Sequence, residues 1–371
     1  MTAPITPAHF NPAARDLRTE PLRDSPLGFH RSLPGYARTP LIPLPAPAEA
    51  LGVGAVRVKD ESRRLGLSAF KILGASYAIA RALSARLGTD EALPLGDLRA
   101  RLGVLGSLSL VAATDGNHGR AVAHVARVLG VPSTILVPSW VAPEAKAAIV
   151  AEGAQLVELQ QSYDEVVAHA AARSGGNAVL IQDTSWDGYT EVPQWIVDGY
   201  ATLLHETDEQ LAEQGLHRLD LVVVPAGVGS LAQAVVHHYR STDHTPALLV
   251  TEPDTAASVT TALRAGEVVP VDTGDTVMTG LNCGSVSEIA WPTLRDGVDA
   301  SVPVTDAQVL AAVNEMAGLG VDSGPCGAAT LAALRTVAAD DEKRARLGLD
   351  EDSVVVLLNT EGTAANPEGT R

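Results

Sequence analysis

Residues 68–77 read Ser-Ala-Phe-Lys-Ile-Leu-Gly-Ala-Ser-Tyr. Apolar and small residues recur at helical spacing from Ile72 to Leu83, so the pattern predicts a helix that begins at Lys71. Phe70 and Ile72 flank this lysine, and poor solvation lowers the pKa of a lysine and makes its amine a nucleophile. Such an amine suits a Schiff base with an aldehyde cofactor. Taken alone, however, Lys71 is better explained as a surface lysine in a first helical turn, so other stretches have to support the chemical interpretation.

The composition describes a chain with ample apolar material and a strong negative charge. Of its 371 residues, 46% are hydrophobic but only 4% are aromatic, so the core must consist mainly of Ala, Val and Leu. The length suggests two lobes or one large α/β unit. A net charge of −17 argues against nucleic acid or an anionic membrane as a partner.

The chain shows no sequence feature of secretion or membrane insertion. Residues 1–5 carry no basic region followed by an apolar run, and no apolar stretch is long enough to span a bilayer. Cys283 and Cys326 are the only cysteines, and they show neither metal-ligand spacing nor a disulfide framework. We therefore expect a cytoplasmic protein without a metal site, and leave open whether the two cysteines pair.

Short apolar stretches alternate with helical patterns along most of the chain. These stretches are apolar on both faces, which is typical of parallel strands covered by helices on both sides. The pattern therefore predicts an α/β protein with open, twisted and mostly parallel sheets. The predicted strands are residues 55–59, 108–113, 134–138, 155–159, 178–181, 219–224, 247–252 and 354–358.

A glycine-rich turn, formed by Gly227, Val228, Gly229, Ser230 and Leu231, follows one predicted strand and opens a helix. Glycines at such a turn let backbone amides approach an anion, and the helix N-terminus adds a favourable partial charge. The chain lacks the lysine of a nucleotide P-loop here, and it lacks the full dinucleotide fingerprint. A single small phosphate is therefore the better ligand, although a tight turn without any ligand explains the glycines equally well.

Two further loops carry carboxylates where a predicted strand ends. Asp115 stands in Thr-Asp-Gly-Asn-His-Gly, where Asn117 can hydrogen-bond a ring hydroxyl or a carboxylate. Asp183 stands in Gln-Asp-Thr-Ser-Trp-Asp-Gly-Tyr, at the crevice that open α/β sheets use for ligands. Simpler interpretations are available for these residues. Asp115 can be a helix N-cap, Asp183 can stabilise its loop, and His118 can belong to a purely structural turn.

Together these stretches resemble the fold-type II family of pyridoxal 5′-phosphate enzymes. Within that family, the likeness is strongest to the ammonia-lyases that act on 2,3-diaminopropionate. It covers nearly the whole chain in the expected order, and the surroundings of Asp115 and Asp183 are its specific part. The matching stretches are residues 29–36, 69–71, 115–119, 182–189, 226–229, 252–253, 280–284 and 360–362.

The resemblance implies a role for each matched residue. Lys71 would form the Schiff base, and Asn117 would face the cofactor's ring hydroxyl. Asp115 and Asp183 would be the acid/base carboxylates, with Lys71 and Asp115 on one side of the substrate and Asp183 on the other. The cofactor-binding residues would be Phe70, Lys71, Asn117, Gly227, Val228, Gly229, Ser230, Leu231, Asn359 and Thr360.

Some positions depart from the family pattern. The family often has serine where Asn359 stands, beside the pyridine nitrogen, and either Asn359 or Thr360 would take that role. Ser285 replaces a usual glutamate, and Pro325 and Cys326 stand where glutamate and serine are usual. These residues would border the substrate or the cofactor, so they bear on the identity of the substrate more than on that of the cofactor.

The resemblance also implies a two-lobed homodimer and a reaction. A small α/β lobe, residues 84–195, would be inserted in a large cofactor-binding lobe formed by residues 1–83 and 196–371, with the site between them. The expected reaction is α,β-elimination of 2,3-diaminopropionate to pyruvate and two ammonia. The cofactor would act as an electron sink, and a carboxylate with a raised pKa would protonate the leaving amine.

Three alternatives remain for the activity. The first is a lyase or dehydratase that acts on serine, threonine or another β-substituted amino acid, and the second is a β-replacement enzyme. The third is a protein that binds a metabolite without catalysis. The intact Lys71, Asn117 and glycine-rich turn argue against this third alternative, because a binding protein has little need of a nucleophilic lysine.

Overall fold

The structure, a computed structural model, describes residues 6–367 and divides into two compact units. Unit 1 consists of Met1–Leu22, Arg38–Arg63 and Leu203–Arg371, and unit 2 of Arg23–Ala37 and Arg64–Thr202. Each unit has its own mostly parallel sheet, so the predicted α/β fold class is confirmed.

This division differs from the expected lobes, because residues 23–37, 64–83 and 196–202 cluster with unit 2 rather than with the larger unit. The segment 64–83 includes Lys71. It clusters with unit 2 because the helix that follows Lys71 packs against elements of unit 2. Among residues 6–367, no helix is both long and apolar enough to cross a membrane.

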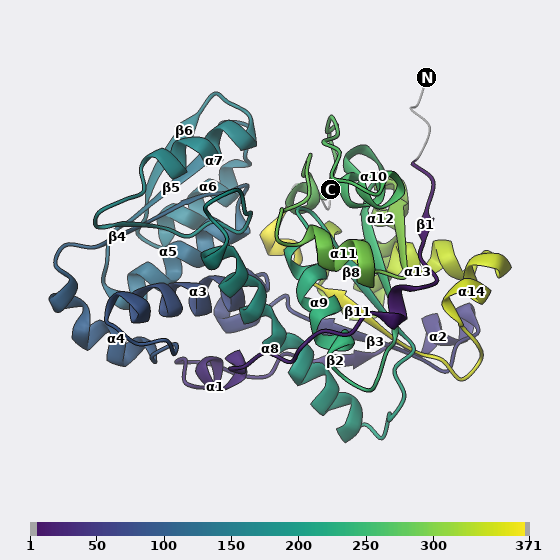
Figure 1. Cartoon of the computed structure of the whole chain (residues 1–371). Helices are drawn as coiled ribbons and strands as arrows, with labels where there is room; N and C mark the ends of the chain where they lie inside the picture. Colours follow the sequence, from purple (N-terminus) through teal and green to yellow (C-terminus); the bar gives the residue numbers. More distant parts are fainter. Residues whose placement is uncertain (1–5, 368–371) are drawn as a thin grey trace. The chain divides into compact units, whose positions relative to one another are not determined.

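The sheet of unit 1 has seven strands, of which β3, β8 and β11 are among those labelled in Figure 1. The strands are β1 (His9–Phe10), β2 (Leu41–Pro43), β3 (Ala55–Asp60), β8 (Leu221–Pro225), β9 (Ala247–Pro253), β10 (Ala300–Val304) and β11 (Val354–Asn359). Their order is β1-β10-β9-β8-β11-β3-β2. The inner strands run parallel, whereas the edge strands β1 and β2 pair antiparallel with β10 and β3.

Helices of unit 1 cover this sheet. They are α2 (Pro45–Leu51), α9 (Ser230–Arg240), α10 (Ser258–Ala265), α11 (Trp291–Gly297), α12 (Asp306–Gly318), α13 (Pro325–Ala338) and α14 (Asp341–Leu347), with short 3-10 turns η1 (Ala14–Asp16), η4 (Asp254–Ala256), η5 (Thr279–Leu281) and η6 (Thr363–Ala365). The helix α13 packs on β8, β9, β10 and β11, and its many alanines allow that close approach. Strand residues such as Val355 and Leu357 are fully buried in the resulting core.

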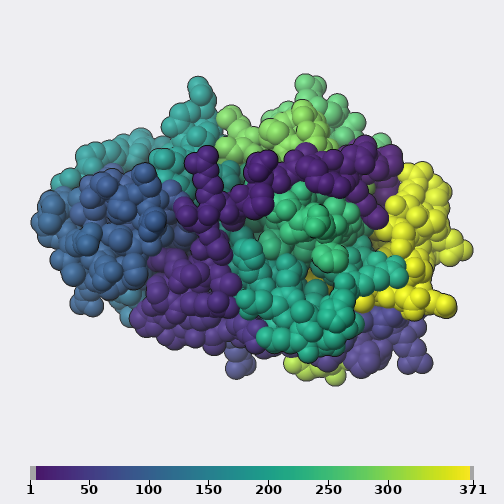
Figure 2. Space-filling model, turned by 60° about the horizontal axis from the view of Figure 1, so that its bottom comes forward, coloured from purple at the N-terminus to yellow at the C-terminus, as the bar shows by residue number. Residues whose placement is uncertain are grey.

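The N-terminal arm, residues 6–22, lies on the surface of unit 1, where Figure 2 shows it as a dark purple band that reaches the yellow C-terminal elements. It is held by β1 and by side-chain hydrogen bonds. Arg15 donates to the Leu347 carbonyl at 2.9 Å, and the Thr19 hydroxyl donates to the His237 carbonyl at 2.8 Å. The arm therefore belongs to unit 1, and its strand β1 forms one edge of the seven-stranded sheet.

Unit 2 is built on a four-stranded parallel sheet. The strands are β4 (Ser109–Ala113), β5 (Ser133–Pro138), β6 (Gln155–Leu159) and β7 (Ala178–Leu180), in the order β6-β5-β4-β7. The helices are α1 (Pro26–Arg31), α3 (Lys71–Arg86), α4 (Leu95–Arg101), α5 (Asn117–Leu129), α6 (Pro143–Ala151) and α7 (Tyr163–Ala172), with 3-10 turns η2 (Arg64–Gly66) and η3 (Leu102–Leu105). Both α5 and α7 pack on β4 and β5, and α3 packs on α5.

The long helix α8 (Glu191–Glu213) contains the boundary between the units, which falls after Thr202. Its first half belongs to unit 2, where Gly199 meets Gly74 of α3. A Cβ on Gly199 would lie 2.7 Å from the Leu73 carbonyl oxygen and 2.9 Å from the Gly74 Cα. The two glycines therefore allow α3 and α8 to approach backbone to backbone, and this contact places the next residue of α8, Tyr200, beside the start of α3.

Candidate active site

Lys71 and Asp183 form an ion pair in unit 2. Lys71 is the first residue of α3, and Asp183 lies in the loop that follows β7. The Lys71 Nζ donates to the Asp183 Oδ2 at 2.7 Å, and the two side chains are 21% and 8% exposed. The structure thus joins two residues that the sequence singled out, but it places Asp183 directly on the lysine, whereas the resemblance implied that it lies on the opposite side of the substrate.

Each member of this pair shifts the pKa of the other. Burial lowers the pKa of Lys71, but Asp183, together with Tyr200 and Asp115, outweighs burial and raises the pKa above its ordinary value. Burial raises the pKa of Asp183, but Lys71, together with smaller contributions that include His118, outweighs burial and lowers the pKa to about 2. The expectation of a lysine with a lowered pKa, drawn from its apolar neighbours Phe70 and Ile72, is therefore wrong here, because it took no account of the facing carboxylate.

Gln182 fixes the loop that carries Asp183. Its side chain is fully buried, accepts a hydrogen bond from the Ala113 amide at 3.0 Å and donates to the Tyr163 hydroxyl at 3.1 Å. The Tyr189 hydroxyl closes the loop, because it donates to the Leu180 carbonyl at 2.9 Å and accepts from the Gln182 amide at 3.0 Å. The loop is thus tied to β4, β7 and α7, and the carboxylate is held by a rigid frame.

The loop between β4 and α5 carries Asp115 and Asn117, both half-buried. The Thr114 hydroxyl accepts hydrogen bonds from the amides of Gly116 and Gly119, at 2.9 and 3.0 Å. Gly116 has a φ of 151°, which favours glycine at this turn. Asp115 lies close enough to Lys71 for its charge to contribute to the raised pKa of the lysine. The structure therefore brings Asp115 into the surroundings of the Lys71 amine.

His118 is also part of this cluster, although the sequence favoured a purely structural role. It is buried, and its Nε2 lies 2.8 Å from the Ile181 carbonyl, which can only accept, so Nε2 carries the hydrogen. Its Nδ1 lies 3.9 Å from the Asp183 Oδ2 and has no hydrogen-bond partner among residues 6–367. Burial lowers the pKa of His118, so the ring is neutral and turns an unprotonated nitrogen toward the carboxylate.

Sequence analysis missed Tyr200. This side chain is fully buried, and its ring lies against Phe70 with the centroids 4.7 Å apart. Its hydroxyl interacts electrostatically with Lys71. The available signal was indirect, since Gly74 and Gly199 are small residues within long helical patterns and mark a close helix contact.

The glycine-rich turn lies in unit 1, between β8 and α9. Gly229 has a φ of 95°, and α9 starts at Ser230 without a side-chain cap, so the amides of its first turn face outward as an anion site requires. Residues of the segment 283–294 pack against this turn. A Cβ on Gly227 would lie 2.9 Å from the Cys283 Sγ, one on Gly229 would lie 2.7 Å from the Leu294 Cδ1, and the Ser287 amide donates to the Val228 carbonyl at 2.9 Å.

Asn359, at the end of β11, is fully buried and its amide is engaged. Its Nδ2 donates to the Asp60 Oδ1 at 2.8 Å and to the Asp322 carbonyl at 2.9 Å, and its Oδ1 accepts from the Ser323 hydroxyl at 2.7 Å. Thr360 is buried as well, and its hydroxyl takes part in none of these hydrogen bonds. Of the two candidates for the pyridine nitrogen, Thr360 therefore has the more available side chain.

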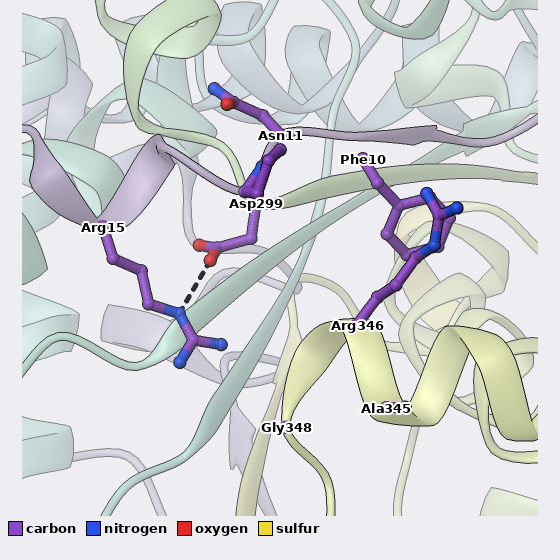
Figure 3. A pocket seen from close by; sticks show the side chains of 8 residues that line it. Phe10, Asn11, Arg15, Asp299, Ala345, Arg346 and Gly348 are labelled. Atoms are coloured by element: carbon purple, nitrogen blue, oxygen red, sulfur yellow. Dashed lines mark hydrogen bonds and ion pairs between the residues drawn. The ribbon is translucent and has the colours of Figure 1, made fainter.

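A hollow of about 530 Å³ in unit 1 lies outside this set of residues. In it, the Arg346 guanidinium covers the Phe10 ring at 5.1 Å, and Arg15 pairs with Asp299 at 2.8 Å (Figure 3). None of the predicted site residues lines it. In the described part of the chain, no three His, Cys, Asp or Glu side chains form a cluster that could hold a metal ion, and Cys283 and Cys326 are not joined by a disulfide.

Comparison with known proteins finds relatives of this chain both by sequence and by structure. Diaminopropionate ammonia-lyase of Escherichia coli K12 is 35% identical over 349 residues, which cover 90% of this chain and 86% of the relative. The enzyme of the same name from Salmonella typhimurium is 35% identical over 358 residues, with 91% and 88% covered. Serine racemase of Arabidopsis thaliana is 28% identical over 231 residues, with 61% and 65% covered.

Solved structures extend this likeness to the fold. The crystal structure of the E. coli diaminopropionate ammonia-lyase with an aminoacrylate–pyridoxal-phosphate azomethine reaction intermediate has a TM-score of 0.87 and 31% identity, and the match covers 98% of this chain and 96% of that one. The family model described as "Pyridoxal-phosphate dependent enzyme" matches residues 33–361. The chemistry of two separate features fits that cofactor: a lysine amine can bond an aldehyde, and a glycine-rich turn at a helix N-terminus can bind a phosphate. The chain belongs to the family of pyridoxal-phosphate-dependent enzymes.

Proposed function

We propose that this enzyme eliminates the β-amino group of 2,3-diaminopropionate as ammonia and releases aminoacrylate, which water hydrolyses to pyruvate and a second ammonia. The observation that carries the proposal is the Lys71–Asp183 pair, in which the nucleophilic amine and an acid/base carboxylate meet at 2.7 Å in a partly open site. Its support from relatives is that the diaminopropionate ammonia-lyases match about nine-tenths of the chain.

We assign the cofactor contacts as follows. Lys71 would bond the aldehyde carbon, Asn117 would meet the ring hydroxyl, and Thr360 would face the ring nitrogen. The turn from Gly227 to Leu231 would hold the phosphate at the N-terminus of α9. When bound, pyridoxal phosphate draws electron density from the α-carbon of an attached amino acid.

The pKa of Asp183 depends on the charge of Lys71. Burial raises the pKa of the carboxylate, and the Lys71 ammonium is the main group that opposes burial and brings the pKa to about 2. Once the Lys71 amine loses its charge, burial dominates and the pKa of Asp183 rises. Asp183 then becomes a stronger proton acceptor, and its protonated form can deliver a proton to the leaving β-amine, which is a poor leaving group without one. The neutral His118 and the half-buried Asp115 complete this proton-handling cluster.

Product stoichiometry tests the proposed function. The pyridoxal-phosphate-loaded protein is incubated separately with each enantiomer of 2,3-diaminopropionate, and with serine and threonine, and ammonia and keto acid are counted. We expect two ammonia per pyruvate from the diamine. One ammonia per keto acid from serine or threonine alone would instead make the protein a dehydratase, and no keto acid from any of them would point to β-replacement chemistry.

Two substitutions test the assignment of the carboxylates. If Asp115 and Asp183 serve opposite enantiomers, then Asp115→Asn and Asp183→Asn lower turnover of different enantiomers by about 10²–10⁴-fold. The measurement is kcat for each enantiomer with each variant. Small and equal losses for both enantiomers in both variants would exclude the two-base assignment.

The cellular setting is part of the same proposal. We place the enzyme in the cytoplasm as a homodimer that acts on a small amino acid. Two cysteines that are not joined by a disulfide are compatible with a reducing compartment, and the family resemblance suggests the dimer. Sedimentation of the purified protein tests the oligomeric state.

A further inference from the structure

Tyr200 has a buried hydroxyl with no hydrogen-bond partner. The side chain is fully buried in unit 2, and no atom of residues 6–367 meets its hydroxyl with hydrogen-bond geometry. A buried tyrosine hydroxyl normally finds a partner, because an unpaired one loses its hydrogen bonds to water without replacement. Packing alone does not explain the hydroxyl, since phenylalanine would fill the same space.

The surroundings of Tyr200 hold this hydroxyl at one place. Phe70 covers one side of the ring, and Gly74 leaves the space that the ring occupies, because a Cβ there would lie 2.6 Å from the Tyr200 Cε1. Buried aromatic rings in such contacts do not move to another position at low cost. The hydroxyl is therefore fixed next to the amine of Lys71, with which it interacts electrostatically.

Lys71 has capacity for a further partner. Its ammonium carries three hydrogens, and Asp183 accepts one of them. If Asp183 turns to the substrate during the reaction, the amine loses this hydrogen bond. The Tyr200 oxygen can accept from the ammonium, and its O–H can donate to the lone pair of a neutral amine, so it serves either form without transfer of a proton.

We propose that Tyr200 is a positioning residue for the Lys71 amine. When Asp183 leaves the amine, the Tyr200 hydroxyl forms a hydrogen bond with the Lys71 nitrogen in its place. This role rests on the proposed function only in that Lys71 must bond the cofactor. It makes Asp183 and Tyr200 alternative partners of one nitrogen, so removal of both should cost more than the sum of the two single losses.

The test compares Tyr200→Phe with Tyr77→Phe. Tyr77 is a matched control because it is a buried tyrosine of α3 whose hydroxyl already has a partner, Arg81. Cofactor-free protein is mixed with pyridoxal phosphate, samples are reduced with borohydride over time, and attachment at Lys71 is quantified by peptide mass spectrometry. We expect attachment to slow about tenfold in Tyr200→Phe, as for the loss of a hydrogen bond to a charged group, and to stay within twofold in Tyr77→Phe.

Two further readouts separate positioning from a structural role. Tyr200→Phe should unfold at the same or a higher urea concentration than the parent, whereas a hydroxyl that supports the fold would lower it. In the loaded enzyme kcat should fall with KM unchanged. In an Asp183→Asn background, Tyr200→Phe should slow attachment by a larger factor than in the parent.

Each contrary outcome overturns a different statement. Attachment at the parental rate in Tyr200→Phe, or equal losses in both tyrosine variants, would remove the positioning role and leave the proposed function standing. A parent that attaches the cofactor at Lys71 but releases no ammonia from the diamine would overturn the proposed function and leave the positioning role standing. A parent that attaches no cofactor at Lys71 would overturn both.

Discussion

Two lysine–carboxylate pairs of this enzyme have the same length but different surroundings. In unit 1, the Lys59 Nζ lies 2.7 Å from the Glu206 Oε2, and in unit 2 the Lys71 Nζ lies 2.7 Å from the Asp183 Oδ2. Lys59 also donates to the Thr39 carbonyl at 2.9 Å and to the Gln210 Oε1 at 2.8 Å. All three hydrogens of its ammonium are therefore used.

The difference separates a structural charge pair from a reactive one. Both side chains of the Lys59 pair are 0% exposed, so no aldehyde can reach the amine. Lys71 is 21% exposed and has Asp183 as its hydrogen-bond partner, and the nearby Tyr200 hydroxyl has no hydrogen bond within residues 6–367. The proposed reactivity of Lys71 is thus favoured by its exposure and its incomplete set of partners, whereas the distance to its carboxylate does not distinguish it from Lys59.

Removal of the reactive lysine should have the largest effect. We expect Lys71→Ala to lower turnover by at least about 10³-fold, which corresponds to about 4 kcal/mol in the activation barrier. The same variant should carry no cofactor after borohydride reduction, as measured by intact mass spectrometry. Lys59→Ala is the comparison: if it too abolished covalent attachment while remaining folded, the distinction between the two pairs would fail.

Removal of the structural lysine should act on stability instead. Lys59→Ala removes the opposite charge beside Glu206, whose carboxylate is fully buried, so we expect the free energy of unfolding to fall by about 3–5 kcal/mol. Urea unfolding measures this, with Lys146→Ala as control. The Lys146–Glu158 pair, 2.8 Å long with Glu158 half exposed, should contribute at most about 1 kcal/mol. Equal losses in the two variants would show that the Lys59 network is not structural.

The third and smallest effect concerns the pH dependence of the cofactor-free protein. Asp183 has a folded pKa of about 2, below its ordinary 3.8, so its contribution to stability is present above pH 4 and is lost as the pH falls toward 2. In Lys71→Ala the main charge that opposes burial is gone, so the pKa of Asp183 rises and the sign reverses: the folded state then favours the protonated carboxyl, and stability is lost as the pH rises. The stability deficit of Lys71→Ala should therefore grow by about 2–3 kcal/mol between pH 2 and pH 6.

Urea unfolding across that pH range measures the deficit, and Asp183→Asn provides the control. If Asp183 is responsible, Lys71→Ala combined with Asp183→Asn should show the same pH dependence as Asp183→Asn alone. A deficit that does not change with pH in the single variant would mean that Asp183 is not coupled to Lys71.

Much of the fold could be predicted because parallel strands buried on both faces are continuous apolar runs. The predicted strands near residues 109–113, 133–138 and 354–359 are present, and α3 begins at Lys71 as its periodicity indicates. The strand Ala300–Val304 was not predicted, since Pro303 interrupts a short run and prolines are rare inside sheets. The two-residue strand β1 is too short to show a pattern.

The site could be predicted only as separate stretches. Lys71, Asp115 and Asp183 were identified because each stands in a motif, but the contact between Lys71 and Asp183 depends on how α3 meets the loop after β7. Tyr200 lies in a helix that carries no motif, and only the packing of Gly74 against Gly199 brings it to the lysine. The direction of the Lys71 pKa could not be predicted for the same reason, because a charge distant in sequence determines it.

The pairing of β3 with β11 has a consequence for the synthesis of the chain. Asp60 and Asn359, which are hydrogen-bonded at the ends of these strands, stand 299 positions apart. At the usual 5–20 residues per second, β3 leaves the ribosome about 15–60 s before its neighbour β11 exists. The second segment of unit 2, Arg64–Thr202, is made during that interval, and its first segment, Arg23–Ala37, is made before β3. The whole sequence of unit 2, with Lys71, Asp115 and Asp183, is therefore complete while β3 still has β2 but not β11 beside it in the sheet.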